Sequence, residues 1–147
     1  MIFISHRGNI SGKNTNLENK KTYINSALDD GFDVELDIWF IKNNFYLGHD
    51  EPQDKVDLDY LKNNRLWCHA KNTEALIEMK DNKVPNFFWH QNDDLTITSN
   101  GFFWTYPGKK LTKNSICLFP ENFKITEFNC AGICSDNIQK FRKYFND

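Results

Sequence analysis

The chain has 147 residues, of which 39% are hydrophobic and 26% are charged. This composition is typical of a soluble globular protein and excludes a disordered chain, and the length suits one domain, which we take as residues 1–147. The formal net charge of −2 provides no basic field that would attract long polyanions. We therefore expect no nucleic-acid partner.

The sequence predicts neither a membrane span nor a secretory route. Its apolar runs are far shorter than the ~20 residues that cross a bilayer. Residues 1–8 lack the charged and apolar regions of a signal peptide. We expect a cytoplasmic protein without transmembrane segments, whose four cysteines are reduced thiols.

Strand and helix periods alternate along the chain. The clearest strand covers residues 32–41, where apolar residues alternate with Glu35, Asp37 and Trp39. In chain order, the predicted elements are a strand (2–5), a polar loop (9–20), a helix (19–30), a hairpin (32–41 with 45–49), a short helix (58–61), a strand (66–71), a helix (73–82), four strands (86–91, 101–106, 115–119, 131–135) and a helix from 138 onward.

This alternation predicts a mostly parallel sheet. The last crossovers, of about 8–14 residues, are close to the minimum for a parallel connection. A complete eightfold β/α barrel needs roughly 200 residues, more than this chain has. We therefore predict an α/β fold, namely a small, irregular or incomplete barrel of about seven mostly parallel strands plus a hairpin strand.

Chemically versatile side chains follow the predicted carboxyl ends of these strands, where parallel sheets form their active sites. They are His6, Arg7, Glu35, Asp37, His49, His69 and Lys71. Glu35 and Asp37 are two residues apart on one strand, so their side chains share a face about 6.6 Å apart. Such carboxylates repel unless a cation lies between them, and oxygen ligands suit Mg²⁺ or Ca²⁺. The alternative is a solvent-facing acidic edge.

The other side chains are also consistent with catalysis at this metal site. His6 and His49 are a candidate acid/base pair near neutral pH, and Arg7 is a candidate phosphate ligand. Each alone also fits a structural turn, but together with the carboxylates they provide the parts of phosphodiester cleavage or another metal-assisted hydrolysis. Trp39 and Trp104 are candidates for a substrate-pocket wall, with core packing as the alternative.

Together these motifs resemble the glycerophosphodiester phosphodiesterase family, within the wider phosphatidylinositol-phospholipase-C-like superfamily. The resemblance is close over residues 2–51 and looser at 66–71, 102–106 and 131–136. It is carried by His6-Arg7-Gly8, Glu18-Asn19, Gly31, Glu35-x-Asp37, His49-Asp50, Phe103-Trp104-Thr105-Tyr106 and Gly132-Ile133-Cys134-Ser135-Asp136. The resemblance implies a TIM-type barrel and divalent-metal-dependent attack on phosphorus by water or a substrate hydroxyl.

The resemblance also implies a role for each matched residue. By this similarity, the acid/base pair is His6 and His49, the phosphate ligand is Arg7, and the metal ligands are Glu35 and Asp37. The family's third metal ligand is a Glu in a Glu-x-Lys strand, whereas this strand reads His69-Ala70-Lys71. A ligating His69 would soften the site toward Mn²⁺, Zn²⁺ or Fe²⁺, and the replacement also fits a weak or degenerate site. Lys71 is expected to bind phosphate.

Three functions stay open at this level. The first is a metal-dependent phosphodiesterase for a glycerophosphodiester-type substrate, either a small diester or a lysophospholipid. The second is a lyase of the same superfamily that forms a cyclic phosphate, and the third is a non-catalytic module that binds phosphate ligands. Much of the family's mid-chain is missing, so the substrate can differ. A shortened barrel also leaves a sheet edge exposed, which a homodimer would cover.

Overall fold

The computed structural model describes residues 1–123 and 127–146. Its elements alternate along the chain much as the sequence patterns predict. They are β1 (Ile2–His6), α1 (Lys21–Asp29), β2 (Asp33–Ile41), β3 (Asn44–Leu47), β4 (Asp54–Val56), α2 (Leu58–Leu61), β5 (Leu66–Ala70), α3 (Thr73–Asp81), β6 (Phe87–Phe88), β7 (Leu95–Ile97), β8 (Phe103–Thr105), β9 (Ser115–Leu118), the 3₁₀ helix η1 (Pro120–Asn122), β10 (Gly132–Ser135) and α4 (Ile138–Asn146).

The strands form one mixed, mostly parallel ten-stranded sheet that is not closed. Parallel pairing runs through β6, β5, β2, β1, β10, β9 and β8. The long strand β2 pairs with β1 and β5 over its first part and with antiparallel β3 over its last part. Strands β4 and β7 add antiparallel edges next to β3 and β8. The predicted α/β class and mostly parallel pairing are confirmed.

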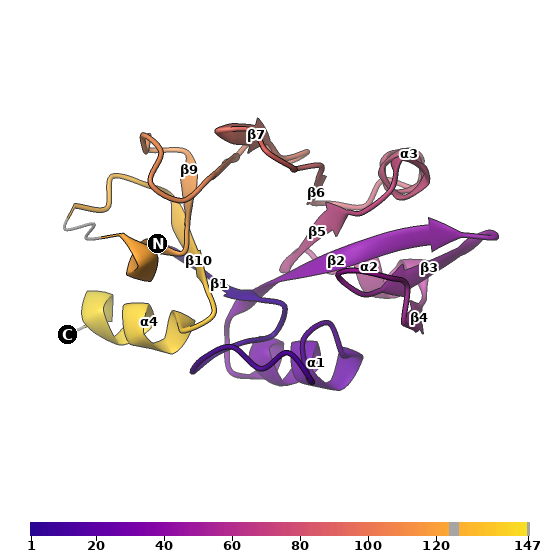
Figure 1. Ribbon diagram of the computed structural model, residues 1–147, viewed down its shortest axis with the longest axis horizontal. Coiled ribbons are helices and arrows are strands. Elements are labelled where there is room, and N and C mark those ends of the chain that lie inside the picture. Colours follow the sequence, from indigo (N-terminus) through magenta and orange to yellow (C-terminus); the bar gives the residue numbers. More distant parts are fainter. Residues whose placement is uncertain (124–126, 147) are drawn as a thin grey trace.

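The sheet is strongly curved (Figure 1). Phe88 of β6 and Trp104 of β8, at opposite ends of the parallel run, have ring centroids only 4.6 Å apart. In addition, the backbone N–H of Ser99 donates to the carbonyl of Phe87 over 2.9 Å. The concave face therefore encloses an apolar cluster drawn from six strands: Ile4, Trp67, Phe88, Trp104, Ile116, Leu118 and Cys134.

Helices cover the convex face of the sheet. Figure 1 shows α1, α3 and α4 on its outer side, and the alternate residues of β2, such as Val34 and Leu36, pack there with Ile24 and Ala75. Because side chains of a strand alternate between faces, Glu35 and Asp37 point to the concave face instead. This two-sided burial explains why β2 carries apolar residues on one face and carboxylates on the other.

Several predicted boundaries change. The strand predicted over 86–91 is only Phe87–Phe88, because its ladder to β5 ends at the pair of His69 and Phe88. Strands β4 and β7 were not predicted, because each has three residues and lies in a polar stretch. The strands and helices expected near 2–5, 66–71, 73–82, 115–119 and 131–135 are confirmed within a residue or two.

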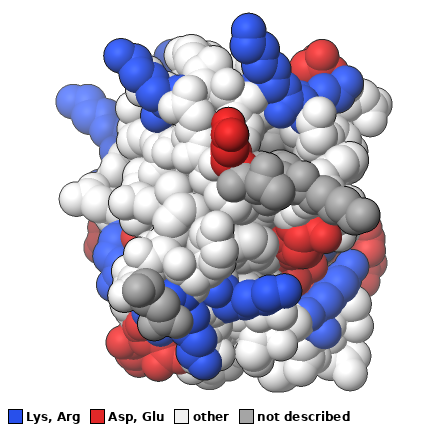
Figure 2. Space-filling view, turned by 90° about the vertical axis from the view of Figure 1, so that its left-hand side faces the viewer, with Lys and Arg blue, Asp and Glu red and all other residues white. Residues whose placement is uncertain are grey.

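The surface agrees with a chain of nearly balanced charge. On the face drawn in Figure 2, Lys and Arg side chains are separated by Asp and Glu and by broad uncharged regions. None of the helices in the described part of the chain has the length and apolar character needed to cross a membrane.

Candidate active site

The parallel strands all end at the same rim of the curved sheet, and the predicted polar residues collect there. The register places His6 of β1 opposite Glu35 of β2, and Asp37 of β2 opposite His69 of β5. Seven of the nine predicted site residues line one cavity of about 320 Å³ at this rim, which we call the central cavity: His6, Arg7, Glu35, His49, His69, Lys71 and Trp104.

Three ligand-type side chains meet under the central cavity. One ligand atom each from Glu35, Asp37 and His69 lies within 4.8 Å of the others. The Nδ1 atom of His69 is 3.2 Å from Oδ1 of Asp37 and 3.6 Å from Oε1 of Glu35. Both carboxylates are buried, Asp37 completely. This group could hold a metal ion.

The carboxylate oxygens of this group fit such an ion. Among the described residues, Glu35 Oε2 and Asp37 Oδ1 are buried without a well-directed hydrogen bond, although His69 Nδ1 is near. Buried carboxylate oxygens are costly unless hydrogen bonds or a cation satisfy them. A divalent cation placed among the three side chains would do so.

His69 is held in a useful orientation. Its Nε2 lies 2.9 Å from the backbone carbonyl of His90, so Nε2–H donates there. Its ring also stacks on Phe88 at 5.0 Å. With Nε2 bonded, the lone pair of a neutral ring lies on Nδ1 and faces the carboxylates, which is the usual support of a metal-binding histidine.

Without a metal ion, Nδ1 of His69 carries a proton. Burial by itself would lower the pKa of His69, but the carboxylates of Asp37 and Glu35 outweigh this effect and raise it to about 9. Burial would likewise raise the pKa of Asp37, but His69, Arg7 and Lys71 hold it well below its usual range. The metal-free group is therefore an ion cluster with His69 as a cation at neutral pH.

The second oxygen of Asp37 is already occupied. Arg7 Nε lies 2.8 Å from Oδ2 of Asp37, and Asn19 Nδ2 donates to the same atom over 2.9 Å. Asn19 Oδ1 also accepts from the backbone N–H of Asp37. Asp37 is thus fixed by two neighbours and offers only Oδ1, which has Lys71 Nζ 3.6 Å away.

Arg7 is held by carboxylates on two sides. Besides its contact with Asp37, its Nη1 donates to Glu18 over 3.2 Å. Burial would lower its pKa, but Asp37 and Glu35 raise it, so the guanidinium stays charged. Its backbone is in the left-handed region with φ 54°, as are Asn19 and Phe119. Such backbone strain concentrates at functional sites.

His6 has an unpredicted partner. Its Nδ1 lies 2.6 Å from Oδ1 of Asp136, which directs Nε2 toward Glu35, 3.7 Å from Oε2. The ring of Phe119 meets it edge-on at 4.8 Å. Burial would raise the pKa of Asp136, but the bonds from His6 and Asn9 lower it. The carboxylate therefore fixes the tautomer and direction of the His6 ring.

His49 also lines the central cavity and is more exposed than His6. Its side chain is 43% exposed, and its Nδ1 is 2.7 Å from Oδ1 of Asp50.

Trp39, predicted in the pocket wall, does not line the central cavity. Its indole N–H donates to the carbonyl of Gly48 over 2.7 Å, so it contacts the backbone just before His49. Trp104 is almost fully buried and forms part of the cavity wall.

Of four further residues of the site, local reasoning assigned no role to Glu18, Asn19 and Asp136, and its strand-end position made His90 only a minor candidate. Three of them stand in motifs that carried the family resemblance, and that signal could have included them. His90 follows β6, and its ring stacks on Tyr106 at 5.1 Å beside the central cavity. Burial and the nearby His69 lower its pKa, so His90 is neutral.

Cysteine chemistry does not suit this site. All four cysteines are free, and three of them are buried. Burial raises the pKa of each thiol, to about 12 for Cys117. Neutral thiols are poor nucleophiles and poor metal ligands.

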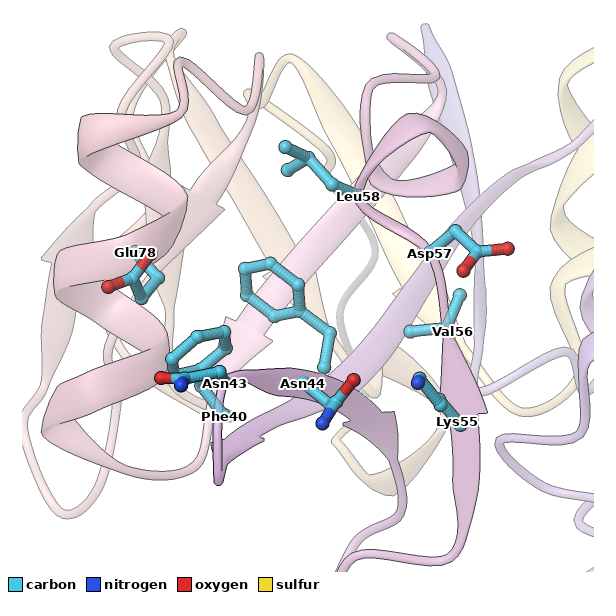
Figure 3. A pocket seen from close by; sticks show the side chains of 9 residues that line it. Phe40, Asn43, Asn44, Lys55, Val56, Asp57, Leu58 and Glu78 are labelled. Carbon is cyan, nitrogen blue, oxygen red and sulfur yellow. The ribbon is translucent and has the colours of Figure 1, made fainter.

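A larger cavity of about 460 Å³ lies away from this rim. Its residues come from the β2–β3 hairpin, β4, α2 and α3, and Glu78, Asp57 and Lys55 stand around it (Figure 3). Apolar side chains such as Phe40 and Leu58, together with the amides of Asn43 and Asn44, form the rest of its wall. This hairpin cavity contains no histidine or cysteine and lacks the paired groups that acid/base chemistry needs.

Comparison of the chain with models of protein families, with curated proteins and with solved structures finds no match. The family resemblance therefore rests on the motifs and on the side chains that stand at those positions.

Proposed function

We propose that this protein is a metal-dependent phosphodiesterase that cleaves a glycerophosphodiester-type substrate, small or lipid-derived. The observation that carries the proposal is the central cavity, which joins two histidines, two cations and a candidate metal group. Phosphodiester cleavage needs a base, an acid and positive charge for the phosphate oxygens.

The metal group is Glu35, Asp37 and His69. Two carboxylates and one imidazole suit Mn²⁺ or Zn²⁺ as well as Mg²⁺ or Ca²⁺. When bound, such an ion would polarise a phosphoryl oxygen and stabilise charge as it develops. Asp37 would bind through Oδ1 alone, because Arg7 and Asn19 hold Oδ2.

The histidines would move protons. In both His6 and His49 a carboxylate holds Nδ1, so that Nε2 is left for the substrate. His6 Nε2 would take a proton from the attacking hydroxyl or water, and His49 would give one to the departing alcohol. Attack by water produces a phosphate monoester, whereas attack by a neighbouring hydroxyl of the substrate produces a cyclic phosphate.

Arg7 and Lys71 would bind the phosphate. The contacts of Arg7 with Asp37 and Glu18 involve Nε and Nη1, which leaves Nη2 for a phosphate oxygen. Lys71 follows β5 and lines the same cavity. Because both cations are largely buried, their attraction for an anion is screened less than at an open surface.

We further infer that the curved sheet is a reduced TIM-type barrel of the glycerophosphodiester phosphodiesterase kind. The support is the run of parallel strands, the enclosed apolar cluster and the site at the carboxyl ends of the strands. In this view β7 and the short β6 stand where a complete barrel would have longer strands.

One observation favours a second candidate, a module that binds phosphate ligands without cleaving them. Arg7, His69 and Lys71 already surround Asp37 within 3.6 Å, so this carboxylate is neutralised even without a metal ion. Such a module would bind phosphate esters with no requirement for a metal.

The test is ³¹P NMR of the purified protein with glycerophosphodiesters and lysophospholipids. It should be run with Mg²⁺, Mn²⁺, Ca²⁺ or Zn²⁺ and with EDTA. A product that needs the metal ion, is absent in His6→Ala and persists in Glu78→Gln of the hairpin cavity supports the proposal. Its chemical shift separates a monoester from a cyclic phosphate. A folded protein that turns over no diester with any metal ion contradicts it.

A further inference from the structure

A second cavity adjoins the central one. It has a volume of about 300 Å³ and shares Arg7 and His49 with the central cavity. We call it the loop cavity, because its other residues lie in the loops after β1 and β3: Lys13, Thr15, Glu18, Asn19, Asp50 and Gln53. The site therefore has two chambers that meet at its proposed phosphate ligand and its exposed histidine.

The two chambers differ in chemistry. Every residue of the loop cavity carries a polar or charged side chain. Hydroxyl, amide and ammonium groups at its wall, such as Thr15, Gln53 and Lys13, are suited to an alcohol with several hydroxyl groups. An apolar group would leave these side chains without partners and would bind poorly.

The central cavity has an aromatic side beyond its charged floor. His90 and Tyr106 stack there with ring planes only 5° apart, and Trp104, Leu118 and Phe119 continue the wall. Tyr106 is 42% exposed although it is a large aromatic residue. Exposed aromatic faces of this kind stack on flat or apolar groups of a ligand.

We propose that the substrate is an asymmetric phosphodiester whose two alcohols occupy different chambers. A compact polyol such as glycerol binds in the loop cavity, and a ring-bearing alcohol binds against His90 and Tyr106. The phosphate lies between them, at Arg7 and His49. This inference rests on the proposed function, because it takes the shared residues as the phosphate site.

Binding of two phosphate monoesters tests the assignment without any need for turnover. The probes are glycerol 3-phosphate and phenyl phosphate, with inorganic phosphate as a reference, measured by titration calorimetry with and without Mn²⁺. The variants are Tyr106→Leu for the aromatic side, and Thr15→Val and Gln53→Ala for the loop cavity. Tyr144→Leu and Gln139→Ala on α4 are matched controls outside both cavities.

We expect a crossed pattern, in which each variant weakens the binding of one probe and leaves the binding of the other nearly unchanged. Tyr106→Leu should weaken phenyl phosphate by about three- to tenfold, the usual effect of a lost aromatic contact, and change glycerol 3-phosphate less than twofold. Gln53→Ala and Thr15→Val should each weaken glycerol 3-phosphate by about two- to tenfold, as for a lost hydrogen bond, and spare phenyl phosphate. Inorganic phosphate and the α4 variants should show neither effect.

The other outcomes are equally informative. If each variant weakens both probes alike, or if neither probe binds at millimolar concentration, the two-chamber assignment is wrong. Turnover is measured in parallel on phenyl phosphoglycerol. Cleavage with no crossed binding pattern supports the proposed phosphodiesterase function but contradicts the two-chamber assignment. A crossed pattern with no cleavage supports the assignment and contradicts catalysis.

Discussion

Nδ1 of His6 lies 2.6 Å from Oδ1 of Asp136, although 130 positions separate the two residues. Parallel pairing of β1 with β10 brings them together, because Ser5 is opposite Ser135 and His6 and Asp136 are the next residues along the two chains. The contact makes Asp136 the positioning partner of the proposed base.

Asp136→Asn should therefore lower kcat while leaving KM nearly unchanged. The amide no longer selects the Nδ1–H tautomer of His6, and general acid/base catalysis contributes roughly 10²–10⁴-fold to rates. We expect a loss of about 10- to 100-fold in kcat, measured by steady-state kinetics on the best diester. Glu121→Gln, which alters the neighbouring bond to Ser135, is the control. Equal kcat values for Asp136→Asn and wild type would contradict the positioning role of Asp136.

Glu35→Gln should weaken metal binding. The amide keeps the shape of the side chain but removes the negative charge and one ligand oxygen. Changes even in outer-shell partners of metal ligands cost about 10–100-fold in affinity, so we expect at least that loss for Mn²⁺ by calorimetry or electron paramagnetic resonance. Glu78→Gln should bind like wild type.

The same metal should stabilise the native protein. At 100 times its dissociation constant, a metal ion that binds only the native state adds about 2.7 kcal/mol. EDTA should therefore lower the Tm of wild type and leave the Tm of Glu35→Gln nearly unchanged. A Tm of wild type that does not respond to any divalent ion would contradict a metal site.

Metal-free protein should lose stability as the pH rises from about 6.5 to about 9. His69 has a pKa near 6.5 when unfolded and about 9 when folded. The native state thus binds the proton more tightly, so the contribution is fully present below pH 6.5 and disappears above pH 9. Its size is on the order of 3 kcal/mol.

Urea unfolding in EDTA at pH 6, 7.5 and 9 measures this dependence. The buried cysteines also destabilise the native state at the alkaline end, because their pKa values are raised. The informative quantity is therefore the difference between wild type and His69→Gln, which should shrink as the pH rises. A difference that is constant from pH 6 to 9 would show that His69 carries no extra proton.

Asn19 should be needed for both stability and the metal site. Its side chain makes two hydrogen bonds with Asp37, and its φ is 59°. Asn19→Ala removes the bonds and adds left-handed strain, so we expect a loss of about 2–4 kcal/mol in unfolding free energy. Asn19→Gly removes the bonds without the strain and should lose about 1–2 kcal/mol less. Equal losses of unfolding free energy in Asn19→Ala and Asn19→Gly would show that the hydrogen bonds, and not backbone strain, account for the whole effect.

The sequence predicted well wherever a short-range period decides the outcome. The period of two in β2 placed Glu35 and Asp37 on one face, and both carboxylates approach His69 Nδ1. This prediction holds because alternation follows from strand geometry alone.

Short segments were less predictable. Phe87-Phe88 and Leu95–Ile97 are strands of two and three residues, too short for a period to show. Their extent depends on the ladder of a neighbouring strand, and for β6 that ladder ends at His69.

Sequence alone determined which chemical groups this protein has and, through strand alternation, which of them share a face. Tertiary structure decided which partner each group receives. Asp136 reaches His6, Asn19 reaches Asp37, and the carbonyl of His90 reaches His69 because the strands before them pair in one sheet and end at one rim. Local patterns encode periodicity over a few residues, whereas these contacts depend on which strands pair across the whole sheet.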